Sequence, residues 1–232
     1  MSGAVAPDLA ALTWRDLENG ADGADARTVL VVPLGATEQH GPHLPLSTDT
    51  DIAVALAVRL AARVRSAVVA APVAFGASGE HQGFPGTLSI GQEAVQLLVI
   101  ELVRSAAATF SRTVLVSAHG GNARPLDRAV RHLRAEKHDV LAFSPRWDGD
   151  AHAGRTETSL MLALAPEKVR LDRAEAGDTS PIESLMPRLR AGGLRAVTAN
   201  GVLGDPAGAS AEEGERLLSR AVDDLVSLVT SR

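Results

Sequence analysis

Short apolar runs alternate along the chain with longer amphipathic stretches. The runs are rich in β-branched residues, are not interrupted by polar residues, and end at glycine or proline, which predicts strands buried on both faces. The expected strands cover residues 28–34, 67–73, 113–119 and 139–143. The amphipathic stretches predict helices over 50–64, 91–110, 125–137 and 211–230, and a further helix through 161–165 that stops at Pro166. Residues 170–210 are rich in glycine and proline, and we expect them to be irregular.

Strands and helices in alternation indicate an α/β fold with a mainly parallel sheet covered on both faces. Two helix starts carry candidate caps: Asp49 or Thr50 for the helix over 50–64, and Thr156 or Thr158 for the segment after residue 152. There is no internal repeat and no low-complexity linker. With 232 residues and 45% hydrophobic residues, we expect a single domain spanning 1–232.

Charge and composition exclude several classes of protein. The net charge of −5 argues against nucleic acid as a partner. No apolar run reaches the roughly 20 residues that span a bilayer, and the first residues lack a basic segment followed by an apolar one. These features predict a cytoplasmic protein without membrane contact. The absence of cysteine means that any metal must be held by His, Asp or Glu.

Polar side chains follow each expected strand at its carboxyl end. The segment GATEQHGPHLPLSTDTD follows the first strand and contains Glu38, His40 and Asp49; Glu80 and His81 follow the second. His119 ends the third strand, and the segment from His152 to Glu157 follows the fourth. Ligands of open α/β sheets bind beyond the carboxyl ends of the strands, so these four segments are expected to meet at one site.

A metal-dependent hydrolase accounts best for this cluster. Glu38 and His40 are two residues apart in an extended segment and can reach one centre, and a His/Asp/Glu set is typical of a site for two divalent ions. Each residue also has a simpler interpretation: polar surface for Glu38 and His40, or a loop hydrogen bond for His119. A G-x-S-x-G elbow, a phosphate loop, a G-x-G-x-x-G turn and an H-E-x-x-H helix are all missing from the sequence.

Four motifs together resemble the creatininase (creatinine amidohydrolase) family in order and spacing. They are GATEQHGPHLPLSTD, SGEHQGFPGTLSI, SAHGGN and HAGRTETSLMLAL, and the resemblance is strong over about residues 30–165. It implies a three-layer α/β/α domain, a homo-oligomer of six or more subunits, and amide hydrolysis at a centre of two divalent ions. The resemblance also implies four metal ligands, of which Asp49 bridges the two ions, and a catalytic, proton-moving role for His152. These ligands are Glu38, His40, Asp49 and His119.

One position departs from the family pattern. Creatininase has a metal-binding glutamate two positions after the ligand histidine, where this chain has Gly121. We expect Glu157 to be the missing metal ligand; the alternative is that Glu157 only orients a ligand or a water. The departure also argues against creatinine as the substrate.

Within the family, HAGRTETSLMLALAPEKVR and ANGVLGDPAGASAEEGERLL resemble a branch that acts in redox-cofactor biosynthesis. That resemblance implies a peptidase that removes a modified C-terminal Val-Tyr unit from a small ribosomal precursor peptide, by attack of a bridging hydroxide on the peptide carbonyl. The ligand set suits Fe²⁺ or Zn²⁺, with Mn²⁺ as an alternative. Two other functions stay open: hydrolysis of a small cyclic amide or formamide, such as creatinine or a formamidopyrimidine, and a non-catalytic metal-binding subunit.

Four further residues have open roles. Glu80 and His81 either face the substrate or order their own loop. Asn122 either orients the substrate or caps the helix that follows it, and Trp147 either stacks on an aromatic substrate group or packs at a subunit contact.

Overall fold

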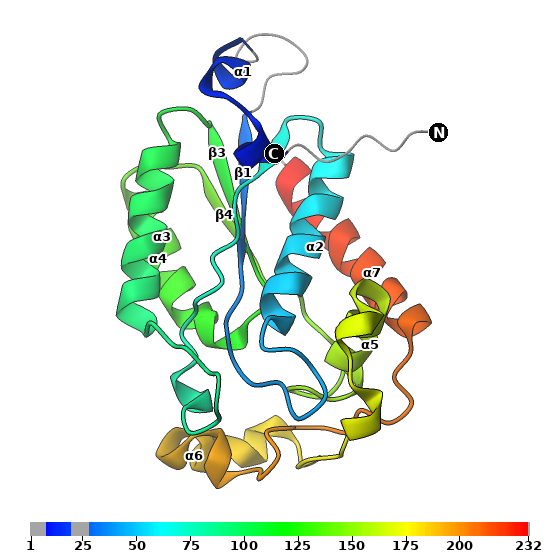
Figure 1. Ribbon diagram of the computed structural model, residues 1–232. Coiled ribbons are helices and arrows are strands. Elements are labelled where there is room, and N and C mark those ends of the chain that lie inside the picture. The colour runs from blue at the N-terminus through cyan, green and yellow to red at the C-terminus, as the bar shows by residue number, and fades with distance from the viewer. Residues whose placement is uncertain (1–7, 20–27, 232) are drawn as a thin grey trace.

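The computed structural model describes residues 8–19 and 28–231 (Figure 1). Its centre is a four-stranded, all-parallel sheet in the order β2-β1-β3-β4, which confirms the predicted α/β class. The strands are β1 (Val29–Leu34), β2 (Ala67–Val69), β3 (Arg112–Ser117) and β4 (Val140–Phe143). β1 is buried along its whole length, as its uninterrupted apolar sequence predicts.

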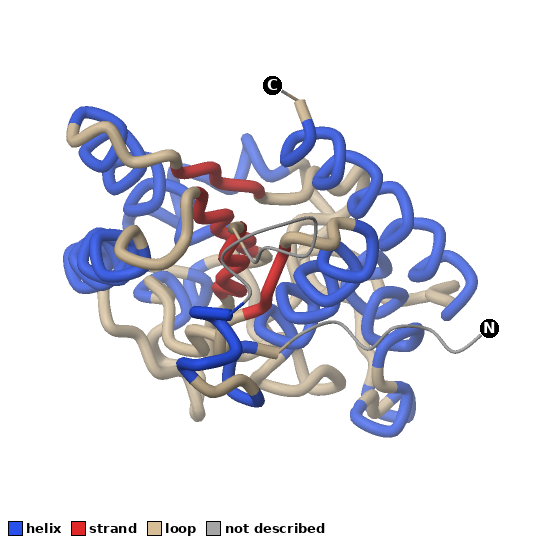
Figure 2. The backbone as a smooth tube through the Cα atoms, turned by 90° about the horizontal axis from the view of Figure 1, so that it is seen from above, coloured by secondary structure: helices blue, strands red, loops and turns tan. Residues whose placement is uncertain are grey.

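Helices cover both faces of the sheet, so the molecule has three layers (Figures 1 and 2). One face carries α3 (Gln92–Ala106) and α4 (Ala123–Ala135). The other carries α2 (Thr48–Arg63), α5 (Arg155–Leu164) and α7 (Ala211–Thr230). Alternate residues of β1 point into the two cores: Val31 packs on the α2/α5/α7 side and Val32 on the α3/α4 side.

The remaining helices lie outside these layers. α1 (Trp14–Asn19) follows a short turn of 3₁₀ helix over Leu9–Ala11. α6 (Ile182–Gly192) lies beyond the carboxyl end of the sheet, at the bottom of Figure 1. None of the helices in the described ranges combines the length and hydropathy that a membrane crossing requires.

Most predicted elements are confirmed, with shifted ends. α7 has the predicted bounds, but β2 stops after three residues and α3 ends at Ala106. The start of α3 excludes Gly91, because its φ of 81° is not helical. The expectation of an irregular segment over 170–210 is wrong, because it contains α6. Pro187 lies inside that helix and gives the sequence the composition of a loop.

Both predicted helix caps are wrong. α2 begins two residues earlier than expected, so Asp49 and Thr50 lie in its first turn and Ser47 precedes it. α5 begins at Arg155 and is capped by Asp150, whose carboxylate accepts hydrogen bonds from the backbone N–H groups of Arg155 and Thr156. In both places the cap was assigned by its position in the sequence, whereas the chain direction decides which backbone N–H groups a side chain can reach.

Candidate metal centre

The loop between β1 and α2, together with the first turn of α2, brings three of the predicted ligands into one buried cluster. Glu38, His40 and Asp49 are almost completely inaccessible to solvent, and one donor atom from each lies within 4.8 Å of the others. Nδ1 of His40 donates to the carbonyl oxygen of Glu38 over 3.2 Å, which leaves Nε2 directed toward the cluster. The loop thus presents the imidazole of His40 and the carboxylate of Glu38 to the same point as the carboxylate of Asp49 in the first turn of α2.

Asp49 stands between two histidines and faces each with a different oxygen. Its Oδ1 lies 3.3 Å from Nε2 of His40, and its Oδ2 lies 3.4 Å from Nδ1 of His119. Two donors of a tetrahedral ion with bonds near 2.1 Å are separated by about 3.4 Å. The spacing on each side of Asp49 is thus close to the spacing of two donors on one ion.

His119 reaches the cluster from the end of β3. Its Nδ1 also lies 3.4 Å from Oε1 of Glu38. Its other nitrogen, Nε2, donates to the carbonyl oxygen of Ala77 over 3.2 Å. A histidine held in this way through one nitrogen keeps the other free as a ligand, which is common at metal sites.

Glu157 and His152 approach from the start of α5. Oε2 of Glu157 lies 3.8 Å from Nε2 of His40 and 3.9 Å from Nδ1 of His152, and it accepts a 2.6 Å hydrogen bond from the backbone of Ala153. His40, His152 and Glu157 form a second group with donor atoms within 4.8 Å. The six predicted site residues thus lie together, and Glu157 is on the His40 side of Asp49.

His81 joins the cluster, although its role was left open from the sequence. Its Nε2 lies 3.2 Å from Oε1 of Glu38, and a third group of donor atoms within 4.8 Å consists of Glu38, His81 and His152. Glu80 lies next to Gly121, within 2.7 Å of the position that a Cβ atom there would take. The loop after β2 is therefore part of the site.

The carboxylates strongly favour protonated imidazoles at two of the histidines. Burial alone lowers the pKa of His40, but the negative charges of Asp49 and Glu157 outweigh this effect and raise the pKa to about 10. Burial likewise opposes the protonation of His119, yet its contacts with Asp49 and Glu38 raise its pKa well above the usual range. A cation is thus favoured at two points of this cluster, one near His40 and one near His119.

An ion pair would lower the pKa of a glutamate and raise that of a histidine. Glu157 and His152 show the reverse of both shifts. Burial raises the pKa of Glu157 to about 7, with Asp49 adding to the effect and His40 opposing it. Burial, reinforced by the neighbouring His40, lowers the pKa of His152 well below its usual range. The neutral form of the His152 imidazole is therefore favoured.

Unpaired donor and acceptor atoms fit a site for cations. In the described residues four buried side-chain atoms make no hydrogen bond, and three of them belong to Glu38, His40 and Asp49. These are Oε2 of Glu38, Nε2 of His40 and Oδ2 of Asp49, and the fourth is Nδ1 of His43. Buried polar groups without partners are costly, so atoms of this kind gathered at one point indicate a ligand that the protein itself does not supply.

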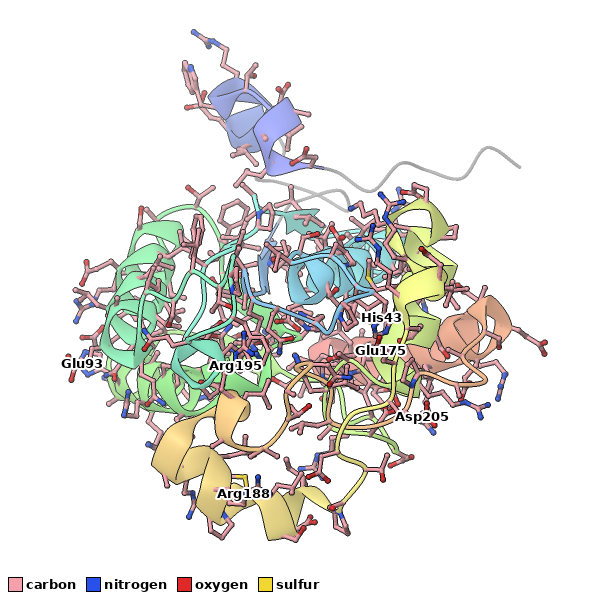
Figure 3. All side chains as sticks on the ribbon, turned by 60° about the horizontal axis from the view of Figure 1, so that its bottom comes forward. His43, Glu93, Glu175, Arg188, Arg195 and Asp205 are labelled. Atoms are coloured by element: carbon pink, nitrogen blue, oxygen red, sulfur yellow. The ribbon has the colours of Figure 1, made fainter. Side chains whose placement is uncertain are left out.

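A cavity of about 1100 Å³ opens above the cluster. Its base includes Glu38, Asp49, His119, His152 and Glu157, and its far wall is formed by α6. In Figure 3, Arg188 marks α6 at the front and His43 marks the loop between β1 and α2 behind it. The α6 side of the wall is mostly apolar, with Ile182, Met186, Leu189 and Leu194.

Two neighbours of His119 explain local features of the site. A Cβ atom at Gly121 would lie 2.3 Å from the carbonyl oxygen of Ala77 and 2.4 Å from Nε2 of His119, so no side chain fits there.

Asn122 neither caps α4 nor faces the cavity. Its amide instead joins two loops, by accepting from the backbone N–H of Ala77 and donating to the carbonyl oxygen of Gly35. Trp147 lines the cavity and also packs against the core.

Comparison with known proteins gives one consistent answer. The family model described as "Creatininase: Creatinine amidohydrolase" matches residues 10–229. A curated relative, the "Mycofactocin precursor peptide peptidase" of Mycobacterium ulcerans (strain Agy99), is 50% identical over 209 residues, which cover 86% of this chain and 84% of the relative.

Solved structures agree with the family match. A crystal structure of creatinine amidohydrolase (creatininase) superposes with a TM-score of 0.81 at 28% identity and covers 97% of both chains. A structure described as "Creatininase Mn" has a TM-score of 0.79 at 29% identity, covering 95% of this chain and 96% of that one.

Proposed function

Because the chain belongs to the creatininase family and is a hydrolase of C–N amide bonds, we propose that its substrate is the mycofactocin precursor peptide. In this proposal the enzyme cleaves the modified C-terminal Val-Tyr unit from that peptide during redox-cofactor biosynthesis. The 50% identity to a mycofactocin precursor peptide peptidase over most of both chains supports the choice of substrate.

The position of Asp49 is the observation that carries the chemistry. One of its oxygens faces His40 and the other faces His119, at distances suited to two neighbouring ions. We propose Glu38, Asp49 and His119 as ligands of one ion, and His40, Asp49 and Glu157 as ligands of the other. Glu157 then replaces the metal-binding glutamate that creatininase has at the position of Gly121. A side chain at Gly121 would collide with its neighbours, so this position cannot supply the ligand.

The donor set suits Fe²⁺ and Zn²⁺, with Mn²⁺ as an alternative, since imidazole and carboxylate ligands accept all three. Two such ions in place would lower the pKa of a water and polarise the scissile carbonyl. The unpaired atoms of Glu38, His40 and Asp49 support this assignment.

His152 is the proposed catalytic residue. Because its imidazole is neutral, its Nδ1 can first take a proton from the attacking water and then give it to the amine that leaves. Its Nε2 is held by the carbonyl oxygen of Gln39 over 2.9 Å, so the ring keeps its orientation while Nδ1 gains and loses the proton.

The size of the cavity favours a peptide over a small cyclic amide. Ligand pockets usually measure about 300–1,000 Å³, and a volume of about 1100 Å³ is slightly above that range. The apolar wall on α6 can contact the side chains of a peptide, whereas creatinine or a formamidopyrimidine would leave most of this volume to water.

The decisive experiment compares substrates for the metal-loaded enzyme. We would incubate the protein with the radical-modified precursor peptide, with the unmodified peptide and with creatinine, and identify products by mass spectrometry. Release of the two-residue unit from the modified peptide is expected. Intact peptide together with hydrolysed creatinine would overturn the proposed substrate and keep the hydrolase, while no hydrolysis at full metal loading would favour a metal-binding subunit.

We also propose that the enzyme is a cytoplasmic homo-oligomer of six or more subunits and acts without nucleic acid or membrane. Light scattering of the purified protein would give the subunit number directly.

A further inference from the structure

Gln39 lies between two of the proposed ligands, and its side chain is buried. Its Oε1 accepts a 2.9 Å hydrogen bond from the backbone N–H of Gly41, and its Nε2 donates to the carbonyl oxygen of Gly201 over 3.1 Å. A backbone N–H can only donate and a carbonyl can only accept, so these two contacts fix which end of the amide carries the hydrogens.

The second amide hydrogen of Gln39 is directed at His81. Nδ1 of His81 lies 3.1 Å from Nε2 of Gln39, and it accepts this hydrogen because the amide nitrogen cannot accept one. The neutral ring of His81 then carries its own hydrogen on Nε2. That nitrogen lies 3.2 Å from Oε1 of Glu38 and donates to it.

The tautomer of His152 is fixed by the backbone carbonyl group of Gln39. Its Nε2 lies 2.9 Å from the backbone carbonyl oxygen of Gln39, which can only accept, so Nε2 carries the hydrogen. The amide nitrogen of Gln39 is also 3.1 Å from Nε2 of His152, but both amide hydrogens already have acceptors in Gly201 and His81. Nδ1 of His152 therefore keeps its lone pair toward Glu157.

We propose that Gln39 is a positioning residue whose side-chain amide holds His81 in the tautomer that donates from Nε2 to Glu38. Through this relay the amide orients the Glu38 carboxylate, and it prevents His81 from offering Nε2 as a competing ligand. The inference deepens the proposed metal centre and rests on Glu38 being a ligand there. It does not depend on which amide substrate the enzyme cleaves.

Gly201 belongs to the same arrangement. Its φ is 83°, and a Cβ atom added to it would lie 1.9 Å from Oε1 of Gln39. The segment around Gly201 thus approaches the amide so closely that only glycine fits, which keeps the Gln39 side chain in one position.

The tautomer can be measured without any substrate. We would label the histidines with ¹⁵N, load the protein with zinc, and record solid-state NMR spectra, in which a protonated ring nitrogen differs from an unprotonated one. Signals would be assigned by comparison with His81→Gln and His152→Gln variants. In the unsubstituted protein we expect hydrogen on Nε2 of His81 and on Nε2 of His152.

Gln39→Glu should move the hydrogen of His81. The glutamate keeps an acceptor for the N–H of Gly41 but replaces the donor by a second acceptor, so Nδ1 of His81 must carry hydrogen to face it. His152 should keep its hydrogen on Nε2, because its partner is the main chain, and it serves as the internal control. A His81 ring that carries hydrogen on Nδ1 before substitution, or that does not respond to Gln39→Glu, would overturn the proposal.

Zinc affinity supplies a second readout. Gln39→Met removes the amide from a side chain of similar length and should weaken zinc binding about 10- to 100-fold in competition with a chromogenic chelator. Gln82→Met is the matched control, since Gln82 is exposed and adjacent to His81, and its affinity should not change. Equal affinities in the two variants would contradict a positioning role for Gln39. Both readouts remain decisive if the mycofactocin peptide proves not to be the substrate.

Discussion

At the scale of single residues, the centre combines groups that the sequence identifies with groups that only the fold reveals. Glu38, His40, Asp49, His119 and Glu157 follow from their motifs and from the rule that strand ends carry sites. The contacts of His81 and Gln39 with each other join residues 42 positions apart, and no pattern in the sequence predicts them. Long-range hydrogen bonds of this kind depend on side-chain direction, which residue spacing alone does not give.

Substitutions of two carboxylates should have different effects on the number of bound ions. Asp49→Asn removes the ligand that we propose both ions share, and it should leave less than one ion per subunit. Glu157→Gln should lower the content from two ions to one, because only the His40 side loses a carboxylate. Metal analysis by mass spectrometry after dialysis measures both values. Two ions retained by Glu157→Gln would show that Glu157 orients a neighbour instead of binding metal.

His152→Ala should separate catalysis from metal binding. We expect both ions to remain, while kcat falls about 10²- to 10⁴-fold, the usual contribution of a positioned acid–base group. The measurement pairs metal content with the rate of hydrolysis under saturating peptide. A variant that kept its full rate would exclude His152 as the proton-moving residue.

His43 should make stability depend on pH. His43 is buried, and its Nε2 forms a hydrogen bond of 2.8 Å with Oγ1 of Thr158. Burial, together with the charge of His40, lowers the pKa of His43 to about 4. Between pH 6.5 and 4 the unfolded chain binds a proton at this residue and the folded protein does not, so stability is lost as the pH falls. The loss is at most about 3 kcal/mol for this shift. Urea unfolding of His43→Gln with a chelator present should show a flatter pH dependence than the parent; parallel curves would exclude His43 as the cause.

At the scale of elements, the sheet and the long helices were predictable because their apolar periodicity is strong. α7 has apolar residues at helical spacing over 20 residues, and the sequence predicted both of its ends correctly. α6 was missed, since Pro187 and the surrounding glycines resemble a loop and only Leu185 of this helix is buried. The starts of α2 and α5 were misplaced because several neighbouring residues in each segment are good caps.

The cap of α5 positions two site residues and can be tested. Asp150 accepts hydrogen bonds from the first turn of α5, and α5 begins three residues after His152 and two before Glu157. Asp150→Ala should cost about 1 kcal/mol of unfolding free energy, the usual value for a lost cap. It should also weaken binding of the ion on the His40 side. Asp148→Ala, at an exposed residue of the same loop, is the control, and an equal loss in both variants would show that Asp150 acts only through general loop stability.

At the scale of the whole molecule, the site is divided between two structural parts. The candidate metal centre lies on the three-layer core, at the carboxyl end of the sheet, and α6 lies beyond that end (Figure 1). α6 contributes apolar side chains to the cavity that the candidate centre also lines. The core could be predicted from the sequence because it follows general rules for parallel sheets. The wall could not, because α6 belongs to a segment whose composition indicates no helix. The cavity is therefore lined in part by a helix that the sequence did not predict.

This division predicts that α6 controls substrate binding without affecting the metal. Leu189→Trp adds bulk on the cavity side of α6 and should raise KM for the modified peptide about tenfold, a loss of about 1.4 kcal/mol. Metal content should stay at two ions per subunit, because Leu189 is on α6 and offers no metal-binding atom. Glu183→Trp places the same side chain at an exposed position of α6 outside the cavity lining and should leave KM unchanged. If both tryptophan variants bound peptide as the parent does, the peptide would have to lie elsewhere, and the apolar wall would have no part in recognition.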